Sequence, residues 1–80
     1  MNTTTTRKSL IGASVLHGSP GYQTPEVIES ITPTDSVGIY EVQFESGVFT
    51  HLSGDELYDL QDDGEVHYTD RNGGFAVITL

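Results

Sequence analysis

The chain has 80 residues, no Cys and a formal net charge of -9, with 12 Asp and Glu against three Lys and Arg. This length allows one small domain with a modest core, and the absence of Cys excludes disulfides and thiolate metal sites. So acidic a chain also lacks the basic patch that direct binding of nucleic acid or of anionic lipid requires.

The first eight residues are polar and rich in Thr, which predicts a tail (1–8) preceding a single β domain (9–80). Arg7 and Lys8 followed by an apolar run resemble the start of a secretion signal. That run is short and is diluted by Gly and Ser, so we expect a cytoplasmic protein. Residues 10–16 are the first strand candidate, and the Gly and Pro of residues 17–21 predict a turn after it.

Two further strands are predicted from alternating side chains. Residues 26–32 place Val27 and Ile31 on one face and Ile28 on the other. Residues 39–45 show the clearest pattern, because Tyr40, Val42 and Phe44 share one face, which is predicted to point inward. A tight hairpin at residues 45–47 leads into another strand over 48–52, because Gly47 can supply a positive φ.

A helix start follows these strands. Ser53 and Glu56 have the spacing of a capping box, which predicts a short helix over residues 54–60 with Leu57 and Leu60 turned inward. Residues 65–70 and 74–80 then form a last hairpin, for which Asn72-Gly73 is a strong turn signal.

These elements predict a mainly β fold: a small, strongly bent antiparallel sheet or SH3-like barrel of five to six strands with one short helical turn. The segment 39–47, followed by Leu52 and Asp55-Glu56-Leu57, resembles the central hairpin and closing turn of SH3-like and Tudor-like barrels. The C-terminal hairpin departs from that pattern. It is either an addition to the barrel or a sign of another small β fold.

The carboxylates are distributed unevenly. All 12 lie between Glu26 and Asp70, and no Lys or Arg lies among them. A one-signed surface repels itself, so its presence calls for a reason. Three reasons stay open: attraction to a basic partner, simple solubility, and adaptation to high salt. In size, acidity and lack of Cys the chain resembles phage-encoded inhibitors of host defence, including anti-CRISPR proteins and DNA mimics.

We therefore predict a non-catalytic binding protein, a monomer in the host cytoplasm, that docks on a basic protein surface. The profile points to a nucleic-acid-binding host defence complex as the partner. Exposed acids would supply the electrostatic field and two aromatic side chains the anchor. The predicted partner-binding residues are Glu41, Glu45, Asp55, Glu56, Asp59, Asp62, Asp63, Glu65, Phe49 and Tyr58.

Two alternatives belong to other classes. An SH3- or Tudor-like adaptor would hold a cationic peptide with Tyr22, Phe49 and Tyr58, with Asp55 supplying charge. A halophilic structural domain would need no partner at all. We expect no cofactor, no metal and no enzymatic activity, since the chain has no nucleophile elbow and its three His lack the same-face spacing of metal ligands.

Overall fold

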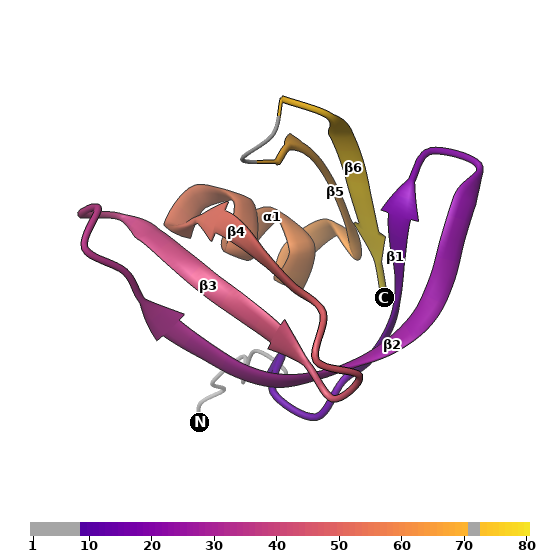
Figure 1. The fold of residues 1–80 in the computed structure, drawn as a ribbon, viewed down its shortest axis with the longest axis horizontal. Coiled ribbons are helices and arrows are strands. Elements are labelled where there is room, and N and C mark those ends of the chain that lie inside the picture. Colours follow the sequence, from indigo (N-terminus) through magenta and orange to yellow (C-terminus); the bar gives the residue numbers. More distant parts are fainter. Residues whose placement is uncertain (1–8, 71–72) are drawn as a thin grey trace, which may run out of the picture.

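A computed structural model describes residues 9–70 and 73–80 of the chain (Figure 1). It contains six strands and one helix. In chain order these are β1 (Ser14–Ser19), β2 (Tyr22–Pro33), β3 (Ile39–Phe44), β4 (Phe49–Ser53), α1 (Gly54–Asp63), β5 (Glu65–Thr69) and β6 (Phe75–Thr79).

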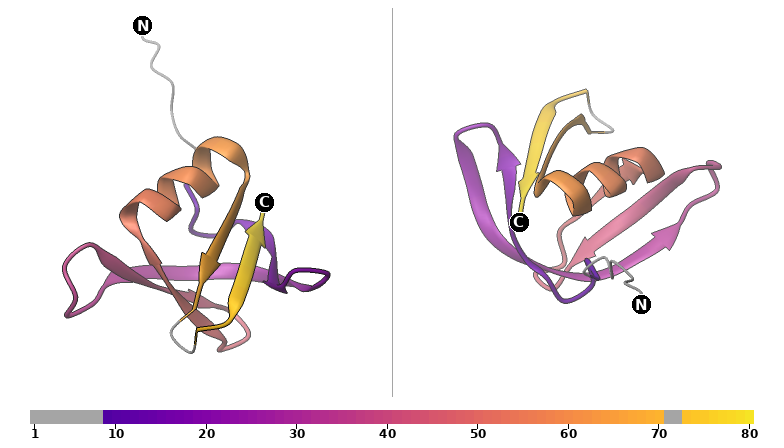
Figure 2. Two further views of the ribbon diagram at one scale, coloured as in Figure 1. Left: turned by 90° about the horizontal axis from the view of Figure 1, so that it is seen from above. Right: turned by 180° about the vertical axis from the view of Figure 1, so that it is seen from behind.

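All six strands form one antiparallel sheet in the order β4-β3-β2-β1-β6-β5. The long strand β2 gives the sheet its bend, because its first half pairs with β1 and its second half with β3. The sheet therefore folds over on itself, and α1 lies inside the bend (Figure 2). The mainly β prediction is confirmed.

A β-bulge lies at the bend of β2. The pairing with β3 shifts between Ile28 and Ser30, so one extra residue is inserted there. Strict alternation would have placed Ile28 and Ile31 on opposite faces, yet both contact the core. The bulge explains the difference, since it re-aims the side chains that follow it and increases the local twist.

The first strand lies further along the chain than the sequence predicted. Residues 10–13 form a turn in which the Ala13 N–H donates to the Leu10 carbonyl at 3.1 Å, and β1 begins only at Ser14. The predicted turn at 17–21 shrinks correspondingly to a hairpin around Pro20-Gly21. Gly18 lies within β1, where a Cβ atom would stand 2.5 Å from the Tyr22 carbonyl oxygen. Close approach of two strands therefore accounts for this glycine, which sequence alone assigned to a turn.

The helix is stabilised at both ends. The Ser53 hydroxyl accepts from the Glu56 N–H at 3.1 Å, and the Glu56 carboxylate accepts from the Ser53 N–H at 2.8 Å. The predicted capping box is thus confirmed. Gly64 ends the helix in the left-handed region at φ 78, so α1 runs to Asp63, three residues beyond the predicted end. Leu60 is fully buried and Leu57 partly buried against the core.

The core fills the space between the folded sheet and α1. The predicted inward residues of β3 are confirmed for Val42 and Phe44, which are fully buried, while Tyr40 is half-buried. Buried side chains from every strand and from the helix join them: Leu10, Val15, Ile28, Leu52, Leu60, Val66, Tyr68, Ala76 and Ile78.

The C-terminal hairpin belongs to this sheet, because β6 pairs with β1 through His17 and Ile78. The predicted turn between its strands falls partly outside the described residues. In the part of the chain that is described, backbone pairing does not close the sheet into a barrel, and β4 and β5 are its two edges. A side-chain hydrogen bond of 2.7 Å between Thr50 on β4 and Tyr68 on β5 joins these edges.

Candidate protein-binding surface

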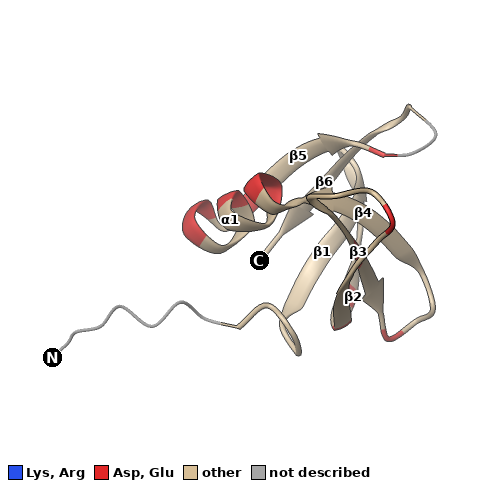
Figure 3. Ribbon diagram, turned by 90° about the vertical axis from the view of Figure 1, so that its left-hand side faces the viewer, with Lys and Arg blue, Asp and Glu red and all other residues tan. Residues whose placement is uncertain are grey.

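An exposed acidic stripe follows α1. Asp55, Asp59 and Asp62 recur at spacings of four and three residues, so they share one face of the helix. All three are exposed, and Asp63 extends the stripe at the last turn. Figure 3 shows these acids along α1 and no basic residue in the described chain, since Arg7, Lys8 and Arg71 lie outside it. We call Asp55, Asp59, Asp62 and Asp63 the α1 stripe.

The aromatic side chain of Tyr58 lies on the same helix face. It stands three residues after Asp55 and is 55% exposed. Among the predicted partner-binding residues, the structure therefore brings Tyr58 together with the four carboxylates of the α1 stripe. An exposed Tyr among charges is the kind of side chain that anchors protein interfaces.

Half of the α1 stripe opposes the stability of its own helix. Asp55 in the first turn is favoured by the positive end of the helix dipole. Asp62 and Asp63 lie at the negative end, and the last turn holds no basic residue. Each unfavourable charge of this kind costs about 0.3–1 kcal/mol. Helix stability thus does not account for these two acids.

The mean charge density of the α1 stripe along the helix axis is close to that of a nucleic-acid strand, although the intervals between its acids are unequal. At a helical rise of about 1.5 Å per residue, its four carboxylates spread over about 12 Å of axis, or about one charge per 4 Å. A single DNA strand carries a phosphate about every 3.4 Å. A protein surface arranged to contact successive phosphates could accept this row of charges.

Two further predicted residues share a second surface, which lies on the face of β3 and β4 that points away from α1. Phe49, 54% exposed, and Glu41 belong to the outer face of β3 and β4, where Glu41 pairs with His51 and Gln43 with Phe49. The His51 ring lies 3.5 Å from the Glu41 carboxylate and makes an edge contact with Phe49 at 5.7 Å. We call Glu41, Phe49 and His51 the outer patch. It faces away from α1, so the predicted single surface is divided into two.

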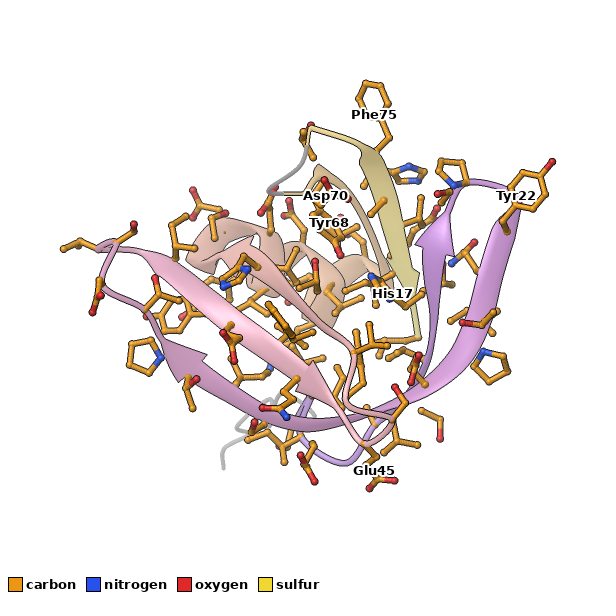
Figure 4. The ribbon with its side chains drawn as sticks, viewed as in Figure 1. His17, Tyr22, Glu45, Tyr68, Asp70 and Phe75 are labelled. Carbon is orange, nitrogen blue, oxygen red and sulfur yellow. The ribbon has the colours of Figure 1, made fainter. Side chains whose placement is uncertain are left out.

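Three other predicted residues lie apart from the α1 stripe. Glu45 follows β3 in the hairpin turn and points away from the helix (Figure 4). Glu56 is half-buried and committed to the capping box. Glu65 begins β5 and contacts His67 at 2.6 Å. Their partner-binding role stays a prediction, but they do not extend the row of charges on α1.

The aromatic cage of the adaptor alternative is not assembled. Tyr22 is 82% exposed and points away from the molecule at the β1–β2 hairpin (Figure 4). Phe49 lies on the outer face of β4, whereas Tyr58 lies on the helix at the inner face. Because the sheet separates them, these three rings cannot surround one cation.

Inside the bend lies a polar cluster that the sequence did not predict. The Tyr68 hydroxyl lies 2.7 Å from the Thr50 hydroxyl and 3.0 Å from His17 Nε2, and the His17 ring stacks obliquely on Phe44 at 4.8 Å. Burial lowers the pKa of His17 below 6.5, although Glu26 and Asp70 act in the opposite sense. Burial also raises the pKa of Tyr68 above 10.0. Both groups are therefore neutral near pH 7, and they join β1, β4 and β5.

The other two histidines each contact a nearby carboxylate and do not form a cluster with His17. His51 contacts Glu41 and His67 contacts Glu65. Within residues 9–70 and 73–80, no three His, Asp or Glu side chains are grouped so as to hold a metal ion. In the same residues, no helix has the length and apolar character needed to cross a membrane.

Comparison with known proteins adds no relative: no protein-family model, curated protein or solved structure matches this chain.

Proposed function

We propose that this chain is a small non-catalytic binding protein that docks through α1 on a basic, nucleic-acid-binding protein surface and blocks access of nucleic acid to it. The observation that supports this most is the exposed α1 stripe with Tyr58 on its face. Two of its acids lie at the negative end of the helix dipole, where a basic partner would offset an unfavourable placement. A phage-type inhibitor of a host defence protein, in the manner of anti-CRISPR proteins, is the most specific form of this proposal.

The chemistry of such a complex follows from the charges. The carboxylates of the α1 stripe attract Lys and Arg over a distance of about 8 Å at physiological salt, which speeds the encounter. Tyr58 then supplies an amphipathic side chain that is desolvated in the complex. Nucleic acid and this protein would compete for the same cations of the partner.

Competitive capture from a host lysate tests the proposal. The chain is immobilised, bound proteins are eluted with rising salt, and a parallel sample is eluted with duplex DNA or RNA at constant salt. We expect a bound protein that nucleic acid displaces. A partner that salt releases but excess nucleic acid does not would contradict the proposed site of action.

The location of the surface is tested with two double variants of equal net charge. Asp59→Asn with Asp62→Asn removes two charges from the α1 stripe, and Glu29→Gln with Asp35→Asn removes two exposed charges elsewhere. We expect the first pair to slow association with the captured partner about tenfold and to weaken its salt dependence, because rim charges act mainly on the on-rate. The second pair should change it little. Equal effects of both pairs would mean that net charge alone matters.

A further inference from the structure

An apolar groove borders the α1 stripe. Its volume is about 330 Å³, and it lies between the turn before β1, the strands β2 and β3, and the helix. Its apolar walls come from Ile11, Ile31, Tyr40, Leu57 and Tyr58. Ile11 is 55% exposed at the rim, so the groove is open to solvent.

Tyr58 connects the groove with the acids. The groove face of α1 is formed by Gly54, Leu57, Tyr58 and Gln61, spaced three and four residues apart. The acidic face begins with Asp55 and continues through Asp59 on the other side of Tyr58. A single short segment lying along the helix could therefore contact an apolar wall and a row of carboxylates at once.

This combination specifies the occupant by its chemistry. The α1 stripe favours Lys or Arg, because its four side chains are all acidic and exposed. The groove volume of about 330 Å³ admits an apolar side chain, and its walls are mostly apolar, so burying such a side chain there is favourable. A purely charged partner would leave the groove unfilled.

We infer that the groove binds an apolar side chain of the partner protein, presented within a segment of Lys and Arg residues that contact the α1 stripe. This inference rests on the proposed function and identifies its partner segment as basic and apolar together. Recognition then has an electrostatic part that salt weakens and an apolar part that salt does not.

Two labelled pentapeptides serve as probes. One has four Arg around a central Leu, and the other has Ser in place of Leu at the same charge. Fluorescence anisotropy gives their affinity for the full chain at about 50 mM and about 500 mM salt. We expect the Leu peptide to bind about tenfold more tightly, which corresponds to about 1.4 kcal/mol, and to keep this advantage at high salt. In NMR spectra, the methyl signals of Ile11 and Leu57 should shift on addition of the Leu peptide but not of the Ser peptide.

Variants of the groove complete the test. Ile11→Ser removes an exposed rim side chain, and Gly54→Leu fills the groove from the helix, where an added Cβ would stand 3.7 Å from Tyr40 Cε1. Both should reduce the affinity of the Leu peptide to that of the Ser peptide. Val37→Ser is the matched control, since Val37 is 101% exposed in the β2–β3 connection outside the groove.

The outcomes separate this inference from the proposed function. Equal affinities of the two peptides, or equal effects of Ile11→Ser and Val37→Ser, would overturn the groove as a binding site and leave the acidic surface intact. Failure of both peptides to bind at low salt would overturn both proposals, because the α1 stripe would then attract no basic segment.

Discussion

His17 and Tyr68 show how individual residues join distant parts of this small fold. Each comes from a different strand, and their hydrogen bond crosses the inside of the bent sheet at 3.0 Å. The Thr50 hydroxyl continues the contact to the opposite edge strand. Buried polar groups are costly when unpaired, and all buried side-chain nitrogen and oxygen atoms of the described residues have partners. The cluster therefore favours one arrangement of the two edge strands, β4 and β5, relative to each other.

At this scale we predict a specific loss of stability in acid. The folded-state pKa of His17 lies below its ordinary value of 6.5, so the unfolded chain binds the proton more readily. Stability is therefore complete above about pH 6.5 and falls as the pH drops from there through the folded pKa. Glu26 and Asp70 reduce this loss, since both attract the imidazolium.

Urea unfolding at several pH values between 7.5 and 5 would measure this loss. The comparison is with His17→Gln, which removes the titrating imidazole and keeps a polar side chain. The natural protein should lose more free energy of unfolding than the variant between the two ends of the range. Parallel pH profiles would show that His17 does not titrate in the way we describe.

The helix is the element on which the functional proposal depends. Its ten residues would be a marginal helix in isolation, so caps and core contacts maintain it. Ser53 and Glu56 satisfy the first turn, Leu60 fixes the buried side, and the acids occupy what remains exposed. The orientation of the α1 stripe thus follows from the same contacts that fold the helix.

We predict that Ser53→Ala destabilises the protein by about 1 kcal/mol, because the Glu56 N–H loses its acceptor at the helix start. Denaturant unfolding measures this, and Ser53→Thr, which keeps the hydroxyl, is the control. Binding of a basic peptide should also weaken in Ser53→Ala, since fraying of the first turn displaces Asp55. Identical stabilities of the Ala and Thr variants would argue against an energetic role of the cap.

For the molecule as a whole, the dominant feature is a large excess of negative charge on a small core. A net charge of -9 in 80 residues opposes compaction, and salt screens this repulsion. The open sheet spreads the acids over the helix, the outer patch and the connecting turns (Figure 3). This spread moderates the repulsion, although α1 still carries the densest group of acids.

Thermal unfolding at low and molar salt separates the proposal from the halophilic alternative. We expect a cooperative transition already at about 50 mM salt, with a modest rise in Tm as the salt screens the carboxylates. A chain that folds only at molar salt would favour adaptation to high salt instead.

Much of the fold could be predicted from local signals. The capping box at Ser53, the hairpin at Gly47 and the alternation in β3 each depend on neighbours a few residues apart, and each is confirmed. Errors occurred where distant strands decide the outcome. Gly18 is required by the close approach of β2, and the bulge after Ile28 by the bend between the two halves of the sheet.

The candidate surface shows the same difference between local sequence signals and contacts made by distant residues. The sequence by itself determined that the chain is acidic, that Asp59, Asp62 and Asp63 have no role in the capping box, and that Tyr58 directly precedes Asp59. Only the tertiary structure decided that α1 lies on the opposite side of the sheet from Phe49, and that Ile11, Ile31 and Tyr40 form a groove beside the helix. Charge and helix caps are local properties of the chain, whereas a groove is made of residues that only folding brings together.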